Sequence, residues 1–373
     1  MSGQEIRDHA GGLAEVLSMK IPSGLGSSRQ SFSQDVKTLR TILEHGVDWA
    51  WKQGYATEQD RLHSEDQGCI SGAEPSVVSE RALERGRNQL GTLGSGNHFV
   101  EVGFVREIFD QQAAAAMGLD QDRATVLIHT GSRGLGHQVC SDALSAMQQA
   151  ARSHGIDLPD RQLCCAPLTS SEGRRYLAAM ACAANFAFVN RQMITHWARE
   201  AFQEMFGSAG AGLELVYDVC HNIAKLETHQ VQGRATRVCV HRKGATRAFP
   251  PGHRDVPKAY RNVGQPVLVP GDMGRCSYVM AGTEAGYAET FGSASHGAGR
   301  LMSRKQAKKA AGGRSIIKEL EAAGIAVKGA SRATLAEEMS LAYKDVNAVV
   351  DVLHQAGISR KVARLEPLAV IKG

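Results

Sequence analysis

The sequence predicts an α+β fold in which strands from distant parts of the chain share one domain. Short apolar segments bounded by glycine and turn residues occur in two clusters, within residues 91–136 and 213–283, and segments with helical spacing surround both clusters. No internal repeat or flexible linker divides the 373 residues. We therefore expect a single interleaved domain with peripheral helices, because distant strand clusters can then complete one sheet system.

The composition is that of a globular protein. With 43% hydrophobic residues and ten prolines, the chain can bury a sizeable core. The net charge of +5 and the pI near 8.8 permit an acidic partner without requiring one. Eight cysteines include no CxxC pair, which argues against a zinc ribbon or a disulfide framework and favours reduced thiols in a cytoplasmic protein. We expect no signal peptide and no membrane span, since no run of about eighteen apolar residues occurs.

The first 90 residues are expected to form a mostly helical lead-in, and residues 91–373 a motif-bearing core. Within the lead-in, residues 31–54 carry apolar side chains at helical spacing. In the core, helix is predicted from Ser141 to about Phe206, and the alanine-rich part from residue 174 is expected to be a buried helix pair. Further helices are expected at residues 303–313, 315–324 and 342–357, and strands at 98–105, 123–129, 213–220, 236–243, 265–271 and 275–283.

Four histidines lie where an apolar segment meets a polar or glycine-rich turn. They are His98 in GTLGSGNHFVEV, His129 in VLIHTGSRGLGH, His221 in VYDVCHNIAK and His296 in GSASHGAGR. Neutral imidazole is a common ligand of divalent first-row metals, and strand ends hold ligands rigidly. The pattern favours one metal site, with four unrelated loop histidines as the alternative, because no HxH or HxxxH spacing is present.

Glycine-rich segments and basic clusters suggest that phosphate is bound. GTLGSGN, HTGSRGLG and SHGAGR combine glycine with Ser, Thr or Arg, but none fits a P-loop or the dinucleotide-binding fingerprint. Basic clusters occur at residues 241–247, 252–254 and 300–309. Arg300, Arg304 and Lys308 are spaced to share one helical face, which could follow a nucleic-acid backbone. A solvated basic helix is the alternative.

Taken in order, the motifs of the chain resemble the RtcB family of RNA-splicing ligases. The matching segments are GTLGSGNHFVEV, HTGSRGLGHQV, CHNIAKLE, HRKGATRAFPPG, PGDMGRCSY, TFGSASHGAGRLMSRKQAK and the terminal KG. The resemblance implies a fold specific to that family and a GTP- and manganese-dependent ligase. Such an enzyme joins RNA ending in a 2′,3′-cyclic phosphate or 3′-phosphate to RNA with a 5′-hydroxyl, through a histidine-GMP intermediate.

The resemblance also implies roles for individual residues. His98, His129 and His221, which we expect to follow strands, match the manganese-binding histidines of the family, and His296 matches the nucleophile that carries GMP. Arg133, Lys243 and Arg304 match RNA-phosphate contacts. The residues that match guanine-nucleotide contacts are Asn97, Phe99, Glu101, Asn222, Pro270, Gly271, Asp272, Met273, Ser277, Ala298, Gly299, Tyr343 and Lys372. Many relatives have serine at position 272, where a carboxylate near phosphates is unfavourable unless it faces a cation or the base.

The sequence departs from the family pattern in its front part. The family motif Asp-x-Gly-Cys-Gly, whose aspartate and cysteine complete the metal site, is missing. Cys69 follows Asp66 in a similar order, but its position and polar setting do not match, and Cys220 is expected to point away from His221. We expect the loss of two anionic ligands to impair metal binding and to remove strands that the core would pack against.

Three explanations for this departure remain open: an N-terminally truncated reading frame, a degenerate paralogue, or a partner chain that supplies the missing ligands. The alternatives to an active RNA ligase are a catalytically inactive RNA-binding protein and a metal-dependent phosphoesterase. The physiological RNA, the oligomeric state and the need for an activating protein cannot be inferred from the sequence.

Overall fold

A central sheet joins the two predicted strand clusters in the computed structural model, which describes residues 1–160 and 162–373. The strand order is β2-β1-β10-β7-β6, and β9 pairs with the second half of β10. Every pairing in this sheet is antiparallel except the one between β9 and β10. The α+β fold is therefore confirmed, with strand bounds Phe99–Ile108 (β1), Ala124–His129 (β2), Pro266–Val269 (β6), Ser277–Gly282 (β7), Ala326–Gly329 (β9) and Ser359–Lys372 (β10).

The longest strand of the sheet, β10, is one that the sequence analysis missed. It pairs with β1 along one edge and with β7 and then β9 along the other, so it lies inside the sheet. Its second half is a continuous apolar run that is buried on both faces. Such a run lacks the alternation of a half-exposed strand and is easily overlooked beside a helical segment.

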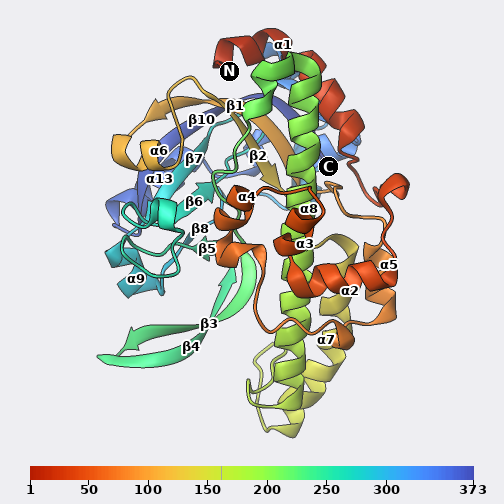
Figure 1. Ribbon diagram of the computed structural model, residues 1–373, viewed down its shortest axis with the longest axis vertical. Coiled ribbons are helices and arrows are strands. Elements are labelled where there is room, and N and C mark those ends of the chain that lie inside the picture. Colours follow the sequence, from red (N-terminus) through yellow and green to blue (C-terminus); the bar gives the residue numbers. More distant parts are fainter. Residues whose placement is uncertain (161) are drawn as a thin grey trace.

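A long hairpin formed by β3 (Asn222–Val231) and β4 (Arg234–Lys243) projects from the molecule (Figure 1). Gln232 and Gly233 connect its strands with φ values of 50° and 75°, the signs required by a type I′ turn. The predicted strand at residues 213–220 is wrong: apart from an isolated bridge between Asp218 and Ser64, the segment forms no ladder, and the strand begins after His221 instead. Next to the base of the hairpin, β5 (Ala245–Arg247) pairs with β8 (Ser293–Ser295).

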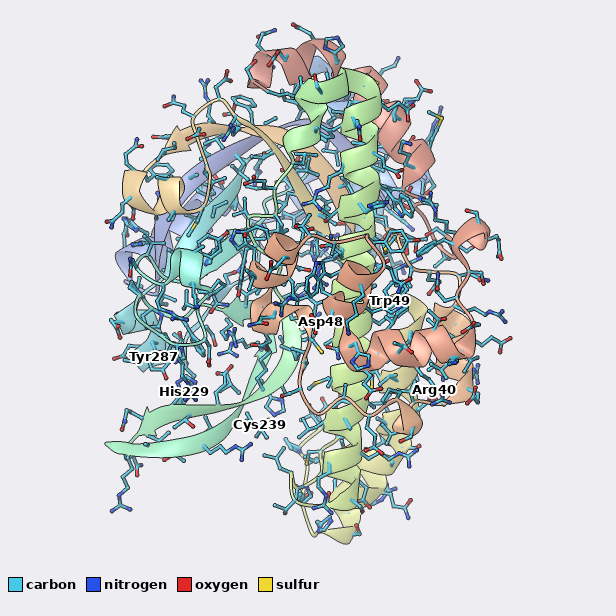
Figure 2. The ribbon with its side chains drawn as sticks, viewed as in Figure 1. Arg40, Asp48, Trp49, His229, Cys239 and Tyr287 are labelled. Atoms are coloured by element: carbon cyan, nitrogen blue, oxygen red, sulfur yellow. The ribbon has the colours of Figure 1, made fainter. Side chains whose placement is uncertain are left out.

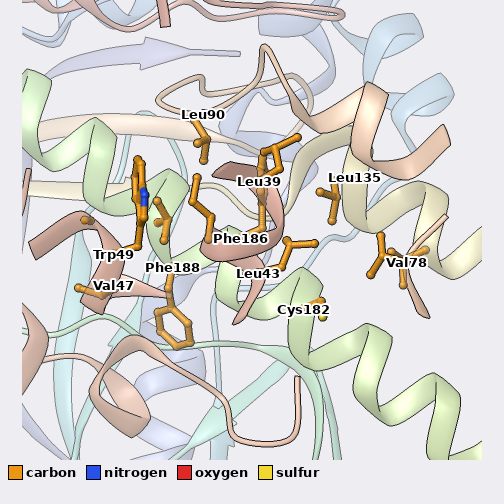
Figure 3. Close-up of a cluster of buried hydrophobic side chains, with 14 of the residues drawn as sticks. Leu39, Leu43, Val47, Trp49, Val78, Leu90, Leu135, Cys182, Phe186 and Phe188 are labelled. Atoms are coloured by element: carbon orange, nitrogen blue, oxygen red, sulfur yellow. The ribbon is translucent and has the colours of Figure 1, made fainter. Parts of the chain in front are cut away.

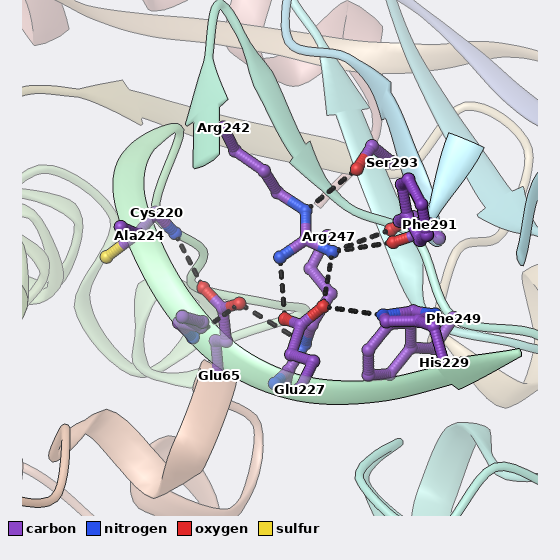
Figure 4. Close-up of polar contacts among 12 residues, drawn as sticks. Glu65, Cys220, Ala224, Glu227, His229, Arg242, Arg247, Phe249, Phe291 and Ser293 are labelled. Carbon is purple, nitrogen blue, oxygen red and sulfur yellow. Dashed lines mark hydrogen bonds and ion pairs between the residues drawn. The ribbon is translucent and has the colours of Figure 1, made fainter. Parts of the chain in front are cut away.

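Buried ion pairs anchor the inner face of this hairpin to the body (Figure 4). The Arg242 guanidinium donates to both carboxylate oxygens of Glu227, at 2.6 and 2.9 Å, and to the Ser293 hydroxyl at 3.0 Å. Glu227 also contacts His229, whose ring lies 4.8 Å from that of Tyr287 (Figure 2). The inner face is therefore fixed by charge pairing as well as by packing.

One helix of 36 residues, α8 (Ser171–Phe206), runs along most of the molecule (Figure 1). The expected helix pair is wrong, because alanines allow close packing along an unbroken helix as well as between two helices. α8 packs against α7 (Arg133–Ser153), α2 (Val36–His45) and α3 (Val47–Lys52) in a core that also contains α5 (Glu80–Gly86) (Figure 3). The predicted helix at residues 31–54 is confirmed in its centre, but Gly46, with a φ of 51°, divides it.

The first helix, α1 (Gly3–Lys20), begins with a capping box between Ser2 and Glu5 and packs on β10 and α8. The three helices predicted near the C-terminus are confirmed as α10 (Arg304–Ala310), α11 (Ile316–Ala322) and α13 (Val346–Gln355). The other helices are α4 (Glu58–Leu62), α6 (Gln111–Ala116), α9 (Glu284–Thr290) and α12 (Arg332–Glu337). Within the described residues, no helix combines the length and apolarity that crossing a membrane requires.

Candidate active site

Three strand ends meet at one edge of the central sheet. Phe99, the first residue of β1, pairs with His129 at the end of β2 and with Lys372 at the end of β10. His98 directly precedes β1, and its carbonyl oxygen accepts a hydrogen bond from the Gly373 amide at 3.2 Å. The strand register therefore brings together residues that are up to 275 positions apart, without any local sequence motif.

The four imidazoles singled out in the sequence lie together at this edge. The Nε2 atoms of His129 and His221 are 3.1 Å apart, and the ring centroids of His98 and His129 are 6.0 Å apart. The ring of His296 stacks on that of His221 at 4.4 Å and lies 6.4 Å from that of His129. The expectation that the first three follow strands holds for His129 only, because His98 and His221 precede β1 and β3.

Burial keeps these rings uncharged. It lowers the pKa of His98 to about 4 and that of His221 to about 3, and it lowers the pKa values of His129 and His296 in the same direction. The Nδ1 atoms of His98, His221 and His296 are buried without a hydrogen-bond partner. The cluster thus holds neutral rings with unpartnered nitrogens, and a neutral imidazole keeps one nitrogen lone pair, with which it can bind a metal or attack phosphorus.

The histidines fit part of a manganese site. Neutral imidazole is a suitable donor, and the unpartnered nitrogens are available. In the described part of the chain, however, no three His, Cys, Asp or Glu side chains are arranged to enclose a metal ion. A divalent cation held at His98, His129 and His221 would therefore need further ligands from a bound phosphate or from another segment.

The Asp66 and Cys69 pair does not supply such a ligand. Asp66 accepts hydrogen bonds from Lys225 at 2.5 Å and from Arg247 at 2.9 Å, below the hairpin. The Cys69 thiol lies 3.4 Å from the carbonyl oxygen of Glu44. Cys220 packs in the hydrophobic core, and burial raises the pKa of its thiol to about 12.

A cavity of about 290 Å³ opens beside the histidines. His129 and His296 belong to its wall, together with Arg300, Arg304 and Glu338. All the residues expected to contact nucleotide, except Asn222, line it: Asn97, Phe99, Glu101, Pro270, Gly271, Asp272, Met273, Ser277, Ala298, Gly299, Tyr343 and Lys372. Asn222 lies instead at the base of the hairpin, opposite Lys243.

Two ionisable groups in this cavity have strongly shifted pKa values. Burial raises the pKa of Glu101 to about 8, and the Ser277 hydroxyl donates to its Oε1 at 3.3 Å. Burial also lowers the pKa of Lys372 to about 8, although its Nζ lies 3.7 Å from Glu338. The cavity can therefore change its charge near neutral pH when a ligand supplies new partners.

The position expected to be unfavourable for a carboxylate, Asp272, is stabilised by its neighbours. Its Oδ1 accepts hydrogen bonds from the Ser340 hydroxyl and, at 3.0 Å, from the Gly274 amide. Arg275 lies 3.6 Å from Oδ2. The cation that the sequence analysis required beside this carboxylate is thus present.

A second and larger cavity, of about 780 Å³, reaches the cluster from the other side. It lies against β2, which is the outer strand of the sheet and whose six residues are all only partly buried. His129, His221 and His296 contribute to its wall. The position of this cavity could not be predicted from the sequence, which indicated only that packing partners of the core were missing.

Comparison with known proteins decides the family. Residues 1–373 match the family described as "tRNA-splicing ligase RtcB". The protein of that name from Archaeoglobus fulgidus is 53% identical over 97% of this chain and 75% of its own length. The chain belongs to the RtcB family. The Thermococcus kodakarensis relative is 51% identical over the whole chain and 78% of its own length, whereas the chain spans only 39% of the Methanocaldococcus jannaschii relative, at 52% identity.

These relatives are named tRNA-splicing ligases, which supports the expected enzyme class, an RNA ligase. The three residues that match RNA-phosphate contacts of the family differ in burial and in location. Arg133, at the start of α7, is largely buried and donates to Thr92 at 3.0 Å and to Ser27 at 2.9 Å. Lys243 is exposed at the end of β4, and Arg304 lies in the wall of the 290 Å³ cavity.

The expected basic helical face is wrong. Arg300 precedes α10, which begins at Arg304, and it points to Glu338 at 3.1 Å. On α10, Lys308 pairs with Glu337 at 2.5 Å. Two acidic residues from α12 and its C-terminal end therefore offset the basic side chains.

Glu338 is the main residue of this RtcB site that sequence reasoning missed. Its side chain is fully buried and contacts Arg300, Lys372 and the Tyr343 hydroxyl. Nothing in the surrounding sequence distinguishes it from a solvent-exposed glutamate in a helix. Its role depends on tertiary contacts, which only the folded chain reveals.

Proposed function

We propose that the chain is a GTP- and manganese-dependent RNA ligase that joins a 2′,3′-cyclic phosphate or 3′-phosphate end to a 5′-hydroxyl end. The observation that carries this proposal is the placement of His296. Its neutral ring lies in the wall of the 290 Å³ cavity and stacks on His221. A nucleophile, a nucleotide-sized cavity and nitrogen donors for a cation are thus adjacent.

The proposed first step is attack by a His296 nitrogen on the α-phosphorus of GTP. A nitrogen–phosphorus bond forms, the bond between the α-phosphorus and the bridging oxygen breaks, and pyrophosphate leaves. A 2′,3′-cyclic phosphate end is first opened by water to a 3′-phosphate. An oxygen of the 3′-phosphate then attacks the GMP phosphorus and the nitrogen–phosphorus bond to His296 breaks. Finally the 5′-hydroxyl oxygen attacks the activated 3′-phosphate and GMP leaves, which forms the new phosphodiester. Depression of the pKa of His296 by burial supports this role, because the unprotonated ring is the nucleophilic form.

The other residues bind and orient the reactants. Glu101 and Lys372 are placed to contact the guanine base, since one can accept and the other donate hydrogen bonds in a buried site. Manganese, when bound near His98, His129 and His221, would offset the negative charge on the phosphates. Arg133, Lys243 and Arg304 would contact RNA phosphates.

An RNA-joining assay tests this function. Two RNA oligonucleotides, one with a 3′-phosphate and the other with a 5′-hydroxyl, are incubated with the protein, GTP and Mn²⁺. We expect a joined product that requires both GTP and Mn²⁺ and is lost in His296→Ala. His154→Ala is the matched control, because His154 lies at the end of α7, outside both cavities.

Two other outcomes would identify a different function. RNA binding without any joined product would indicate an RNA-binding protein without ligase activity. Release of phosphate from the RNA end without GTP would indicate a phosphoesterase. Either result would contradict the proposal.

A further inference from the structure

The outer face of the β3–β4 hairpin, defined here as the residue pairs 222/243, 224/241, 226/239, 228/237 and 230/235, is free of ion pairs within the described chain. Residues paired directly across an antiparallel ladder share one face, so these pairs form a continuous surface. Asn222, Thr228, Arg237, His241 and Lys243 on this face are all exposed.

The charge on this face has one sign only. Arg237 and Lys243 are cations without an acidic neighbour on the face, and the one acidic residue of the hairpin strands, Glu227, belongs to the inner face and pairs with Arg242. Asn222, Thr228 and Gln230 add uncharged hydrogen-bond donors. Apart from Leu226, which is exposed in the middle of the face, the face offers cations and neutral donors, and these complement a phosphate backbone.

The outer face is also continuous with the candidate active site. At one end of the ladder Asn222 pairs with Lys243, and His221 directly precedes Asn222. On the other strand at this same end, Gly244 follows Lys243, and its carbonyl oxygen accepts a hydrogen bond from the His296 amide at 3.4 Å. From this end the ladder extends over all ten residues of β4, and its nine steps span about 31 Å at roughly 3.4 Å per residue. It projects beyond the body of the molecule (Figure 1).

We propose that the outer face of the hairpin is a binding track for the RNA strand that enters the active site. This inference rests on the proposed ligase function and names a surface for its substrate. The face carries no Phe, Tyr or Trp, so we expect its contacts to be mainly to the sugar-phosphate backbone and independent of base sequence. Alternate positions along β4 place Lys243, His241 and Arg237 in line to meet successive phosphates.

Reversal of one charge on the track tests the inference. Binding of a 3′-phosphorylated dinucleotide and a 3′-phosphorylated dodecanucleotide is measured by fluorescence anisotropy at several salt concentrations. We expect Arg237→Glu to weaken binding of the long RNA about tenfold and to reduce the slope of log K against log salt by about 1 or more, because a phosphate contact is lost. Binding of the dinucleotide, which is too short to reach Arg237, should not change.

Arg234→Glu is the matched control, because Arg234 is exposed on the same strand but belongs to the opposite face of the ladder. Thr228→Glu, directly across from Arg237, should reproduce the loss by a different substitution. Unchanged binding of the long RNA by Arg237→Glu would overturn the inference. That result is the one expected if the face binds an acidic protein instead of RNA. Equal weakening by Arg234→Glu would also overturn it, because the effect would then be one of total charge.

Failure of the proposed function would look different. In that case the wild-type protein itself would fail to bind the two RNAs, or would bind them without joining RNA ends, whatever the hairpin variants do. If the wild type binds and joins RNA and Arg237→Glu equals the wild type, the inference about the hairpin fails alone.

Discussion

His221 and His296 stack with their ring centroids 4.4 Å apart and their planes inclined by 29°. One ring is matched to a metal ligand and the other to the nucleophile, so the contact places the two proposed functions side by side. A cation held on His221 would lie close to any phosphate under attack by His296. The following predictions test this arrangement and the residues that support it.

Substitution of His221 by Ala should weaken manganese binding. Removal of a residue that only hydrogen-bonds to a metal ligand typically lowers metal affinity by about tenfold or more. Removal of a nitrogen that binds the metal directly should lower it at least as much. Free Mn²⁺ can be followed by electron paramagnetic resonance during a titration. His154→Ala should bind as the wild type does, and equal affinity of the His221 variant would refute the assignment.

Substitution of Glu101 by Gln should stabilise the fold above about pH 5. The folded pKa of about 8 exceeds the ordinary value of 4.5, so the folded state binds more protons than the unfolded state in this range, and stability falls as pH rises. A neutral amide removes this cost, which we place at roughly 1–3 kcal/mol at pH 8. Thermal melts at pH 4.5 and pH 8 measure it.

The same variant should bind GTP more weakly, because guanine presents two neighbouring N–H donors and glutamine replaces one of the two carboxylate acceptors with an NH2 donor. We therefore expect a raised Tm at pH 8, no difference from wild type at pH 4.5, and reduced nucleotide affinity. A variant that melts below the wild type at pH 8 would show that burial of Glu101 is not costly.

Substitution of Lys372 by Ala should weaken GTP use more than RNA binding. The side chain is 3% exposed, lies over the Phe99 ring and lines the 290 Å³ cavity, so it is placed to contact nucleotide. GTP titration and RNA anisotropy would give the two affinities. Lys361→Ala, on the same strand but paired with Asp351, is the control. Equal losses of GTP and RNA binding in Lys372→Ala would contradict the nucleotide assignment.

Substitution of Arg242 by Met should destabilise the protein by about 3–5 kcal/mol, because it leaves the buried Glu227 carboxylate without its charge partner. The guanidinium also donates to the Phe291 carbonyl oxygen at 2.8 Å, which would lose its partner. Chemical denaturation measures the change. Arg234→Met, exposed near the turn of the same strand, should alter stability by less than about 0.5 kcal/mol. Comparable effects of the two substitutions would refute the proposed anchor.

Local pattern was sufficient to predict much of this fold. β1, β2, β4, β6 and β7 have apolar runs bounded by turns, and the capped helices near the C-terminus have helical periodicity. β10 was missed because its buried apolar run does not alternate with polar residues. A strand was expected at residues 213–220 from its apolar pattern, but it does not form, since such a pattern does not by itself provide a partner strand. Strand pairing depends on residues far away in the chain.

The candidate site was predicted through motifs rather than geometry. Glycine and histidine motifs identified the four imidazoles, and the family resemblance implied thirteen nucleotide contacts, all of which except Asn222 line the cavity. The register that sets Phe99 between His129 and Lys372 could not be read from the sequence, since it joins three separate segments. Glu338 was missed for the same reason, because its partners come from other elements.

The central claim is that His296 accepts a nucleotide while the neighbouring imidazoles hold a cation. Mass-spectrometric mapping of the protein after incubation with GTP and Mn²⁺ tests it most directly. The account predicts one GMP adduct, on His296, which is absent when Mn²⁺ is chelated. An adduct on a residue outside the two cavities, or no adduct in a protein that still joins RNA ends, would contradict it.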